Sequence, residues 1–267
     1  MNKSVPVIEE LQNTVFKNFN IPREDILKLK VYHYIKYDYF FKSINNKNIL
    51  FDRVIDWDDK YENFLFKAKI NVNGQNISFE KEAGWVYAKC FTIKEESYAM
   101  WLNRNEDYIK YETTVEDIFY SIFKLCANII NNRKFIFRIG IVEYKTKSEI
   151  QSFYKEKFQV QSNLINIGNE LFDSILIKRV EYKYEKELRA VLFFENINSE
   201  NLNPIELKYR TFPLKVNSIV FHPKISQSIF EERKKNLIKI GFKNIKKSDI
   251  LDNNYLRMTI KNKTFNK

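Results

Sequence analysis

Glycine is scarce in this chain, which has five among its 267 residues, and no two of them lie close together. The phosphate-binding loops GxGxxG and GxxxxGK need closely spaced glycines, because the backbone must approach the phosphate without a Cβ in the way. Neither pattern can be written anywhere in the sequence, and GxSxG, HExxH and EF-hand loops are absent as well. The sequence therefore argues against a Rossmann or P-loop enzyme.

Cysteine and long apolar runs are also rare. Cys90 and Cys126 are the only cysteines and lie far apart, which excludes a disulfide framework and a CxxC metal knuckle. No apolar run approaches the roughly 18 residues that a membrane-spanning helix requires. The first ten residues carry two carboxylates where a secretory signal would be hydrophobic. We therefore expect a cytoplasmic protein with no membrane partner.

Apolar and aromatic residues are plentiful, at 44% and 16% of the chain, including 23 Phe and 16 Tyr. This composition predicts a globular protein, and the length suits one domain over residues 1–267. The net charge of +11 would favour polyanions such as nucleic acid. The basic residues are spread along the chain without a dense block, so we take the charge as permissive evidence for such a partner.

Hydrophobic periodicity predicts an α+β fold, because strands and helices interleave irregularly. We expect an N-terminal helical extension over residues 1–28 with a helix at 6–19, a core over 30–221, and a C-terminal helix and strand over 222–267. Strands are predicted at 30–35, 48–51, 86–92, 135–144, 184–194, 205–209 and 216–221. Helices are predicted near 37–44, 114–129, 148–160, 167–178 and 224–240, the last ending at Gly241 as its C-cap glycine.

Two strand motifs contain residues that suit chemistry. Period-two alternation places His33, one of only two histidines, beside Val31 and Ile35, where a core histidine with one hydrogen bond is the default interpretation. Alternation also places Glu187 and Arg189 on one face of the strand at 184–194. They are either a surface ion pair worth little or a carboxylate held by a cation beside a sugar that develops positive charge. The residues alone leave both interpretations open.

The acidic segment at 56–62 has four carboxylates, and these could bind a divalent cation through oxygen. Such a run is more often a solvated turn in which an Asp caps a helix, and we favour that interpretation. We predict no metal site.

Several short motifs follow one another in a definite order. They are Tyr32-His33-Tyr34, Ile49-Leu50-Phe51, Trp57-Asp58-Asp59-Lys60-Tyr61-Glu62-Asn63, Cys90-Phe91-Thr92, Met100-Trp101 and Glu185-Lys186-Glu187-Leu188-Arg189. In this order the chain resembles the bacterial domain of unknown function 2971, whose members read HYT, NDPFE, CFS, MW with a following Tyr, and ExEWR. The resemblance covers Val31 to the strand near Val220. The chain departs from the pattern at Ile35 for Thr, at Lys60 for Pro, and at Leu102-Asn103-Arg104 for Ser-His-Tyr.

The opening of that family in turn resembles the ADP-ribosyltransferase fold, which implies a mixed or antiparallel split sheet with flanking helices and NAD as the substrate. The resemblance gives His33 and Glu187 the catalytic roles. His33 would hydrogen-bond the adenosine-side ribose, and Glu187 would hold the nicotinamide ribose and stabilise its oxocarbenium ion. The cofactor-binding residues it implies are His33, Tyr34, Thr92, Trp101, Arg104 and Arg189, with an aromatic ring on the nicotinamide and an arginine on the pyrophosphate.

The resemblance thus predicts an ADP-ribosyltransferase that transfers ADP-ribose to a macromolecular acceptor, either nucleic acid or protein. A toxin or anti-phage role with an antitoxin or inhibitory partner would suit such an enzyme. One alternative is a nucleic-acid-binding protein or metal-dependent nuclease that uses Asp58, Asp59, Glu62 and Glu185. The other alternative is a non-catalytic interaction or sensor domain that keeps the fold.

Overall fold

The computed structural model describes residues 16–59, 61–67, 69–72, 75–79, 86–129, 135–160, 167–194, 205–208 and 214–251. Its centre is a large mixed sheet in which most neighbouring strands are antiparallel, and only the two end pairs, β1–β8 and β13–β14, are parallel. The strand order is β1 (Phe16–Lys17), β8 (Phe135–Ile141), β11 (Glu187–Phe194), β6 (Val86–Thr92), β2 (Lys30–Lys36), β7 (Tyr108–Thr114), β13 (Ser218–Phe221) and β14 (Ile245–Lys247). The predicted α+β class with a mixed sheet matches this arrangement.

The sheet is split along one edge of β6. Near the end of β6, Thr92 pairs with Tyr32 of β2. Further along the same strand, Ala88 and Tyr87 pair with β3 (Asn48–Arg53), which also pairs with β12 (Ile205–Lys208). Residues 89–91 lie between these two pairings and pair with neither strand in the described part of the chain. The strands β2 and β3 therefore diverge here and leave an opening in the sheet.

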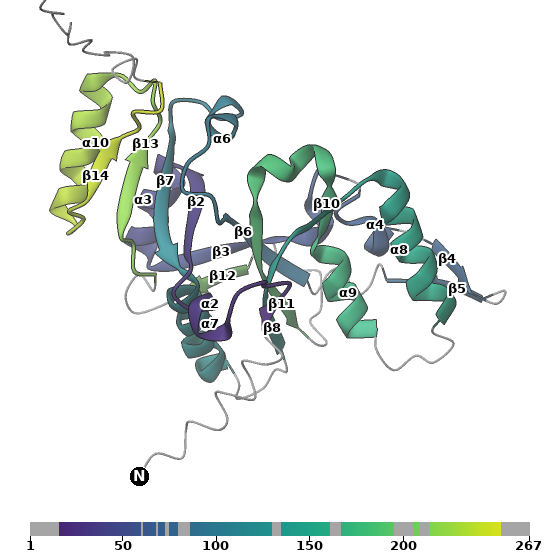
Figure 1. Cartoon of the computed structure of the whole chain (residues 1–267). Coiled ribbons are helices and arrows are strands. Elements are labelled where there is room, and N and C mark those ends of the chain that lie inside the picture. Colours follow the sequence, from purple (N-terminus) through teal and green to yellow (C-terminus); the bar gives the residue numbers. More distant parts are fainter. Residues whose placement is uncertain are drawn as a thin grey trace, which may run out of the picture.

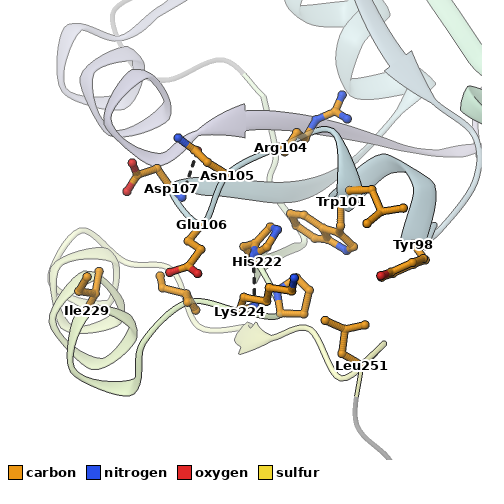
Figure 2. Close-up of a pocket in the computed structure, with 13 residues that line it drawn as sticks. Tyr98, Trp101, Arg104, Asn105, Glu106, Asp107, His222, Lys224, Ile229 and Leu251 are labelled. Carbon is orange, nitrogen blue, oxygen red and sulfur yellow. Dashed lines mark hydrogen bonds between the residues drawn. The ribbon is translucent and has the colours of Figure 1, made fainter.

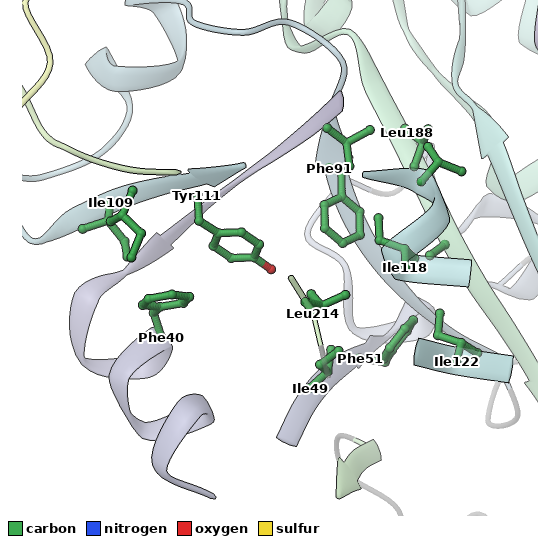
Figure 3. Packing of buried hydrophobic residues seen from close by; sticks show 14 of the residues in the cluster. Phe40, Ile49, Phe51, Phe91, Ile109, Tyr111, Ile118, Ile122, Leu188 and Leu214 are labelled. Carbon is green, nitrogen blue, oxygen red and sulfur yellow. The ribbon is translucent and has the colours of Figure 1, made fainter. Parts of the chain in front are cut away.

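Helices cover both faces of the sheet (Figure 1). On one face, α3 (Tyr37–Asn46), α7 (Val115–Ile129) and α10 (Gln227–Lys239) contribute to a core with the alternate β11 residues Leu188, Ala190 and Leu192. Figure 3 shows part of this core, in which Phe40 stacks on Tyr111 at a centroid distance of 5.2 Å. On the other face, α4 (Phe64–Lys67), α8 (Lys147–Val160) and α9 (Ile167–Ile175) pack around Val191. Alternate side chains of β11 thus pack into two separate cores, one on each face of the sheet.

Shorter elements complete the described chain. They are α2 (Arg23–Ile26), η1 (Val54–Asp56), the β4–β5 hairpin (Lys69–Val72 and Gln75–Ser78), α6 (Tyr98–Leu102), the parallel pair β9 and β10 (Glu143–Lys145 and Ile177–Arg179), and η3 (Val180–Glu185). Gly241 follows α10 with a φ of +103°, a backbone conformation that favours glycine, so the predicted C-cap glycine is confirmed. No helix within the described ranges is long and apolar enough to cross a bilayer.

Two sequence expectations are wrong. The helix expected at 6–19 lies mostly outside the described residues, but Phe16 and Lys17 form a strand that pairs with β8. A strand at 108–114 was not predicted, although β7 pairs with β2 along its whole length. In its sequence, YIKYETT, Ile109, Tyr111 and Thr113 alternate with Lys110 and Glu112, a strand pattern that the prediction overlooked, and the burial of Lys110 follows only from the packing of the sheet.

Candidate functional site

A cavity of about 650 Å³ opens where the sheet splits, a size typical of a ligand site. We call it the split pocket. Strands β2, β3 and β6 form its floor, and the acidic segment after β3, the α6 end and the η3 turn form its walls. Its lining includes Tyr32, His33, Tyr34, Asp52, Arg53, Trp57, Glu62, Cys90, Thr92, Arg104, Lys178, Tyr182, Glu185 and Glu187.

His33 fills the gap that the split leaves. Its Nδ1 lies 2.7 Å from the carbonyl oxygen of Cys90, a β6 residue that β2 and β3 do not pair with. Because a carbonyl only accepts, Nδ1 carries the proton in this hydrogen bond. Burial and the nearby Lys89 ammonium hold the pKa of His33 well below its usual range, so the ring is neutral at pH 7. Its Nε2 is then a hydrogen-bond acceptor, which suits a ligand hydroxyl.

Glu187 begins β11, one strand beyond β6, and its carboxylate is held by two cations. Arg189 donates from Nε to Oε1 at 2.9 Å and from a terminal nitrogen to Oε2 at 3.0 Å. Lys178 donates to Oε2 at 3.1 Å. Burial alone would raise the pKa of Glu187, but Arg189 and Lys178 outweigh it and hold the pKa at about 2. The site therefore has a fixed anion, only 4% exposed, at the pocket wall.

Glu187 belongs to a buried cluster of three carboxylates and two cations. Glu62 accepts from both Arg189 and Lys178, and Lys178 also donates to Glu185 at 2.6 Å. The guanidinium carbon of Arg189 lies 4.4 Å from the centroid of the Trp57 ring, so Trp57 packs against the cluster. The cluster as a whole has one more negative than positive charge. An excess of fixed negative charge favours a ligand that carries or develops positive charge.

The pKa of Glu187 predicts acid sensitivity. It is about 2 in the folded protein against a usual value of 4.5, so folding favours the ionised form. This contribution to stability is complete above pH 4.5 and is lost as the pH falls through 2. Burial raises the pKa of Glu185, so the effect of Glu185 on stability has the opposite sign. That effect changes with pH only above pH 4.5. The urea midpoint should therefore drop steeply below pH 4.5. An equally steep drop in Glu187→Gln would contradict this assignment.

Arg104 and Tyr34 form a second wall of the pocket. The guanidinium carbon of Arg104 lies 4.8 Å from the Tyr34 ring centroid, and one terminal nitrogen donates to the Met100 carbonyl at 2.6 Å. In the described part of the chain Arg104 forms no ion pair with a carboxylate. Burial lowers the pKa of this arginine, a cost that an anionic ligand would offset. Arg104 is therefore suited to hold a phosphate.

Of the residues predicted for the site, His33, Tyr34, Thr92, Arg104 and Glu187 line the split pocket. His33 and Glu187 share this pocket, as expected, but their strands are not neighbours, because β6 lies between them. The Thr92 hydroxyl donates its proton to the Glu185 carbonyl at 2.5 Å, so it has no proton left to donate to a ligand. This hydrogen bond fixes the turn before Glu187.

Trp101 and Arg189 do not line the split pocket. Trp101 lies behind Tyr34, edge-on at 4.7 Å between ring centroids, and its Nε1 donates to Glu96 at 2.8 Å. Arg189 is fully buried beneath Glu187 and Glu62. The prediction that it binds the pyrophosphate is therefore wrong. Strand alternation correctly predicted that Arg189 lies beside Glu187. The sequence alone did not show that α9 covers the face of β11 on which both residues lie.

Sequence reasoning missed Lys178, and it considered Glu62 only as a possible metal ligand of the nuclease alternative. The segment 56–62 was interpreted as a solvated turn, and Asp59 does accept from the Tyr61 backbone at 2.9 Å as such a turn requires. Glu62 is different, because it is buried and ion-paired. Asn63 fixes the turn by donating to the Trp57 carbonyl at 2.9 Å. Lys178 stands in a short Ile-Lys-Arg strand with no local signal of its role.

Three of the four carboxylates of the nuclease alternative, Asp59, Glu62 and Glu185, have cation partners. Asp59 accepts from Arg179 at 3.0 Å, and Glu62 and Glu185 both accept from Lys178. Within the described residues, no group of three or more His, Cys, Asp or Glu side chains is arranged to hold a metal ion. The strand predicted at 184–194 begins only at Glu187, because Glu185 ends a 3-10 turn and Lys186 takes a left-handed conformation. Glu185 does not share a strand face with Glu187.

Comparison with known proteins gives a similarity to solved structures. No protein-family model matches the chain, and no curated protein matches it, so the resemblance to the 2971 family stays a prediction. Three solved structures of DarT from Thermus sp. 2.9 are similar at 11% identity over 82% of this chain. They are complexes with carba-NAD+, NAD+ and ADP-ribosylated single-stranded DNA, with TM-scores of 0.34, 0.35 and 0.36 over 94%, 95% and 94% of DarT. These TM-scores are too low to transfer any residue role from DarT.

Proposed function

We propose that the protein binds NAD in the split pocket, cleaves its glycosidic bond to nicotinamide and transfers ADP-ribose to a macromolecular acceptor. One observation carries the proposal: an imidazole that is neutral at pH 7, with an acceptor nitrogen, and a carboxylate that is ionised at pH 7 lie in the same cavity. NAD has two riboses with hydroxyl donors, an anionic pyrophosphate between them and a cationic nicotinamide ring at one end. The chemistry of these groups matches that of the pocket.

Three polar side chains of the pocket, those of His33, Arg104 and Glu187, contact NAD in this account. A ribose hydroxyl donates to His33 Nε2, and Arg104 takes the pyrophosphate. Glu187 accepts from a hydroxyl of the nicotinamide ribose and lies beside its C1. When the C1–N bond breaks, the electron pair leaves with nicotinamide, and positive charge develops on the ribose ring. A carboxylate that is already ionised and clamped by Arg189 and Lys178 stabilises this charge without reorganisation.

The acceptor completes the reaction. Its nucleophilic atom forms the new bond to C1 and gives up its proton, so the pyridinium charge of NAD ends as one released proton. Water in place of the acceptor gives free ADP-ribose and nicotinamide. Nicotinamide release thus reports the cleavage whatever the acceptor, and label transfer from NAD reports the second step.

NAD should raise the melting temperature of the protein, because a ligand that binds only the folded state stabilises it by mass action. We expect His33→Ala and Arg104→Gln each to reduce this shift, since each removes a ground-state contact. Lys145→Gln is the control, because Lys145 pairs with Glu143 and neither residue lines the split pocket. Magnesium ions and a chelator should leave the melting temperature unchanged. Stabilisation by magnesium with none by NAD would replace the proposal with the nuclease.

A further inference from the structure

The positive charge of the chain is concentrated at one end of the sheet. Residues 224–247 have eight lysines and arginines against two glutamates, which supplies more than half of the net charge of +11. This corrects the impression from the sequence that the charge is evenly spread. These residues form α10 and the edge strand β14, which lie together at one end of the molecule (Figure 1). The fold thus gathers a basic surface that a linear scan of the sequence divides among short runs.

Most of these lysines are exposed and carry uncompensated charge. Lys224, Lys235, Lys239, Lys243 and Lys246 are all exposed, and none of them forms an ion pair in the part of the chain that the structure describes. We call these five residues the basic end. Lys235 and Lys239 are four residues apart on the solvent face of α10, opposite the buried Phe230 and Leu237. Glu231 and Glu232 also lie on α10, but residues 224–247 still have eight cations against these two carboxylates.

A second cavity, of about 530 Å³, adjoins the basic end. Four large apolar side chains around it are exposed, namely Tyr98 at 45%, Leu102 at 59%, Ile229 at 41% and Leu251 at 37%. Figure 2 shows Tyr98, Ile229 and Leu251 around His222, with Lys224 beside it. The Lys224 backbone donates to His222 Nδ1 at 3.1 Å, which fixes this turn. Exposed apolar side chains gathered beside a charged surface indicate a binding site.

We propose that the basic end and this cavity together bind single-stranded nucleic acid. Phosphates lie along Lys235, Lys239 and Lys243, and bases pack against Tyr98 and Leu102 in the cavity. A single strand fits better than a duplex, because its base faces are free to stack on aromatic and apolar side chains. Two acidic residues, Glu106 and Asp107, also line the cavity, and Arg233 offsets the charge of Asp107 at 2.9 Å.

The cavity also adjoins the split pocket, because Arg104 lines both and α6 forms the wall between them. If the protein is the transferase proposed above, a strand held here is placed to supply the acceptor. This last step rests on the proposed function, whereas binding of the strand does not. Binding of the strand without NAD and nicotinamide release without the strand therefore test the two proposals separately.

The test is binding of a short fluorescent single-stranded DNA, without NAD, to the whole protein over a range of salt concentrations. Lys235→Glu/Lys239→Glu should weaken binding about tenfold or more and lower the slope of log affinity against log salt by about 1.4, roughly 0.7 for each lost phosphate contact. The control Lys67→Glu/Lys155→Glu makes the same charge change on exposed lysines of α4 and α8, at the opposite end of the molecule. It should bind as the unaltered protein does.

A second variant separates stacking from charge. Tyr98→Ala should weaken binding of the single strand by about tenfold and leave the salt slope unchanged, because it removes a ring and no charge. An equal loss in both lysine pairs, equal affinity for duplex and single strand, or binding only to anionic vesicles would each overturn the proposal.

Discussion

Glu187→Gln is expected to lower nicotinamide release from NAD by a hundredfold or more while NAD affinity changes little. Glutamine keeps the shape of the side chain and removes the anion, which acts mainly on charge that appears in the transition state. The rate is measured by nicotinamide release at saturating NAD, and the affinity by calorimetry. A rate close to that of the unaltered protein would leave Glu187 as a structural ion-pair partner of Arg189 and remove the proposed mechanism.

Glu62→Gln is the comparison for this variant. Glu62 contacts the same two cations, Arg189 and Lys178, so its loss disturbs the charge cluster to a similar extent. It should reduce stability about as much as Glu187→Gln but reduce turnover far less, because the proposal places Glu187 alone beside the reacting carbon. Equal losses of turnover in the two variants would show that the effect comes from the cluster and not from Glu187.

Arg189→Met is expected to cause the largest loss of stability, about 3–5 kcal/mol, because it leaves Glu62 and Glu187 buried with only Lys178 between them. Urea unfolding at pH 7 measures the loss. Arg179→Met is the matched control, since it breaks the more exposed pair with Asp59 and should cost no more than about 1 kcal/mol. A small loss for Arg189→Met would mean that the two carboxylates are relieved by water or protonation.

The order of elements was largely predictable, because many of them have strong local patterns. The face of α3 that contains Tyr37 and Phe40 packs into the core as its helical spacing predicts. Thr114 caps α7 by accepting from the Asp117 backbone at 3.1 Å, and the Thr-x-x-Asp spacing of such a cap is visible in the sequence. In contrast, β7 has buried polar residues that only its neighbours explain. The short strand β1 has too few residues to produce any periodic signal.

The chemistry of the site was predictable only in part. Glu187 and Arg189 are two residues apart in a strand, so their pairing follows from alternation. The partners Glu62 and Lys178 are distant in sequence, and only the packing of the 56–62 segment and β10 around β11 joins them to the cluster. The split that admits His33 depends on where two other strands stop pairing with β6, and no local pattern in β6 indicates that.

The central claim is that NAD lies across the split in the sheet, between His33 and Glu187. The most direct test is the structure of the protein bound to an NAD analogue that resists cleavage. We expect one ribose hydroxyl within hydrogen-bond distance of His33 Nε2, the pyrophosphate at Arg104, and the nicotinamide ribose beside the Glu187 carboxylate. An analogue bound outside the split pocket, or one that leaves both His33 and Glu187 without a contact, would contradict the account.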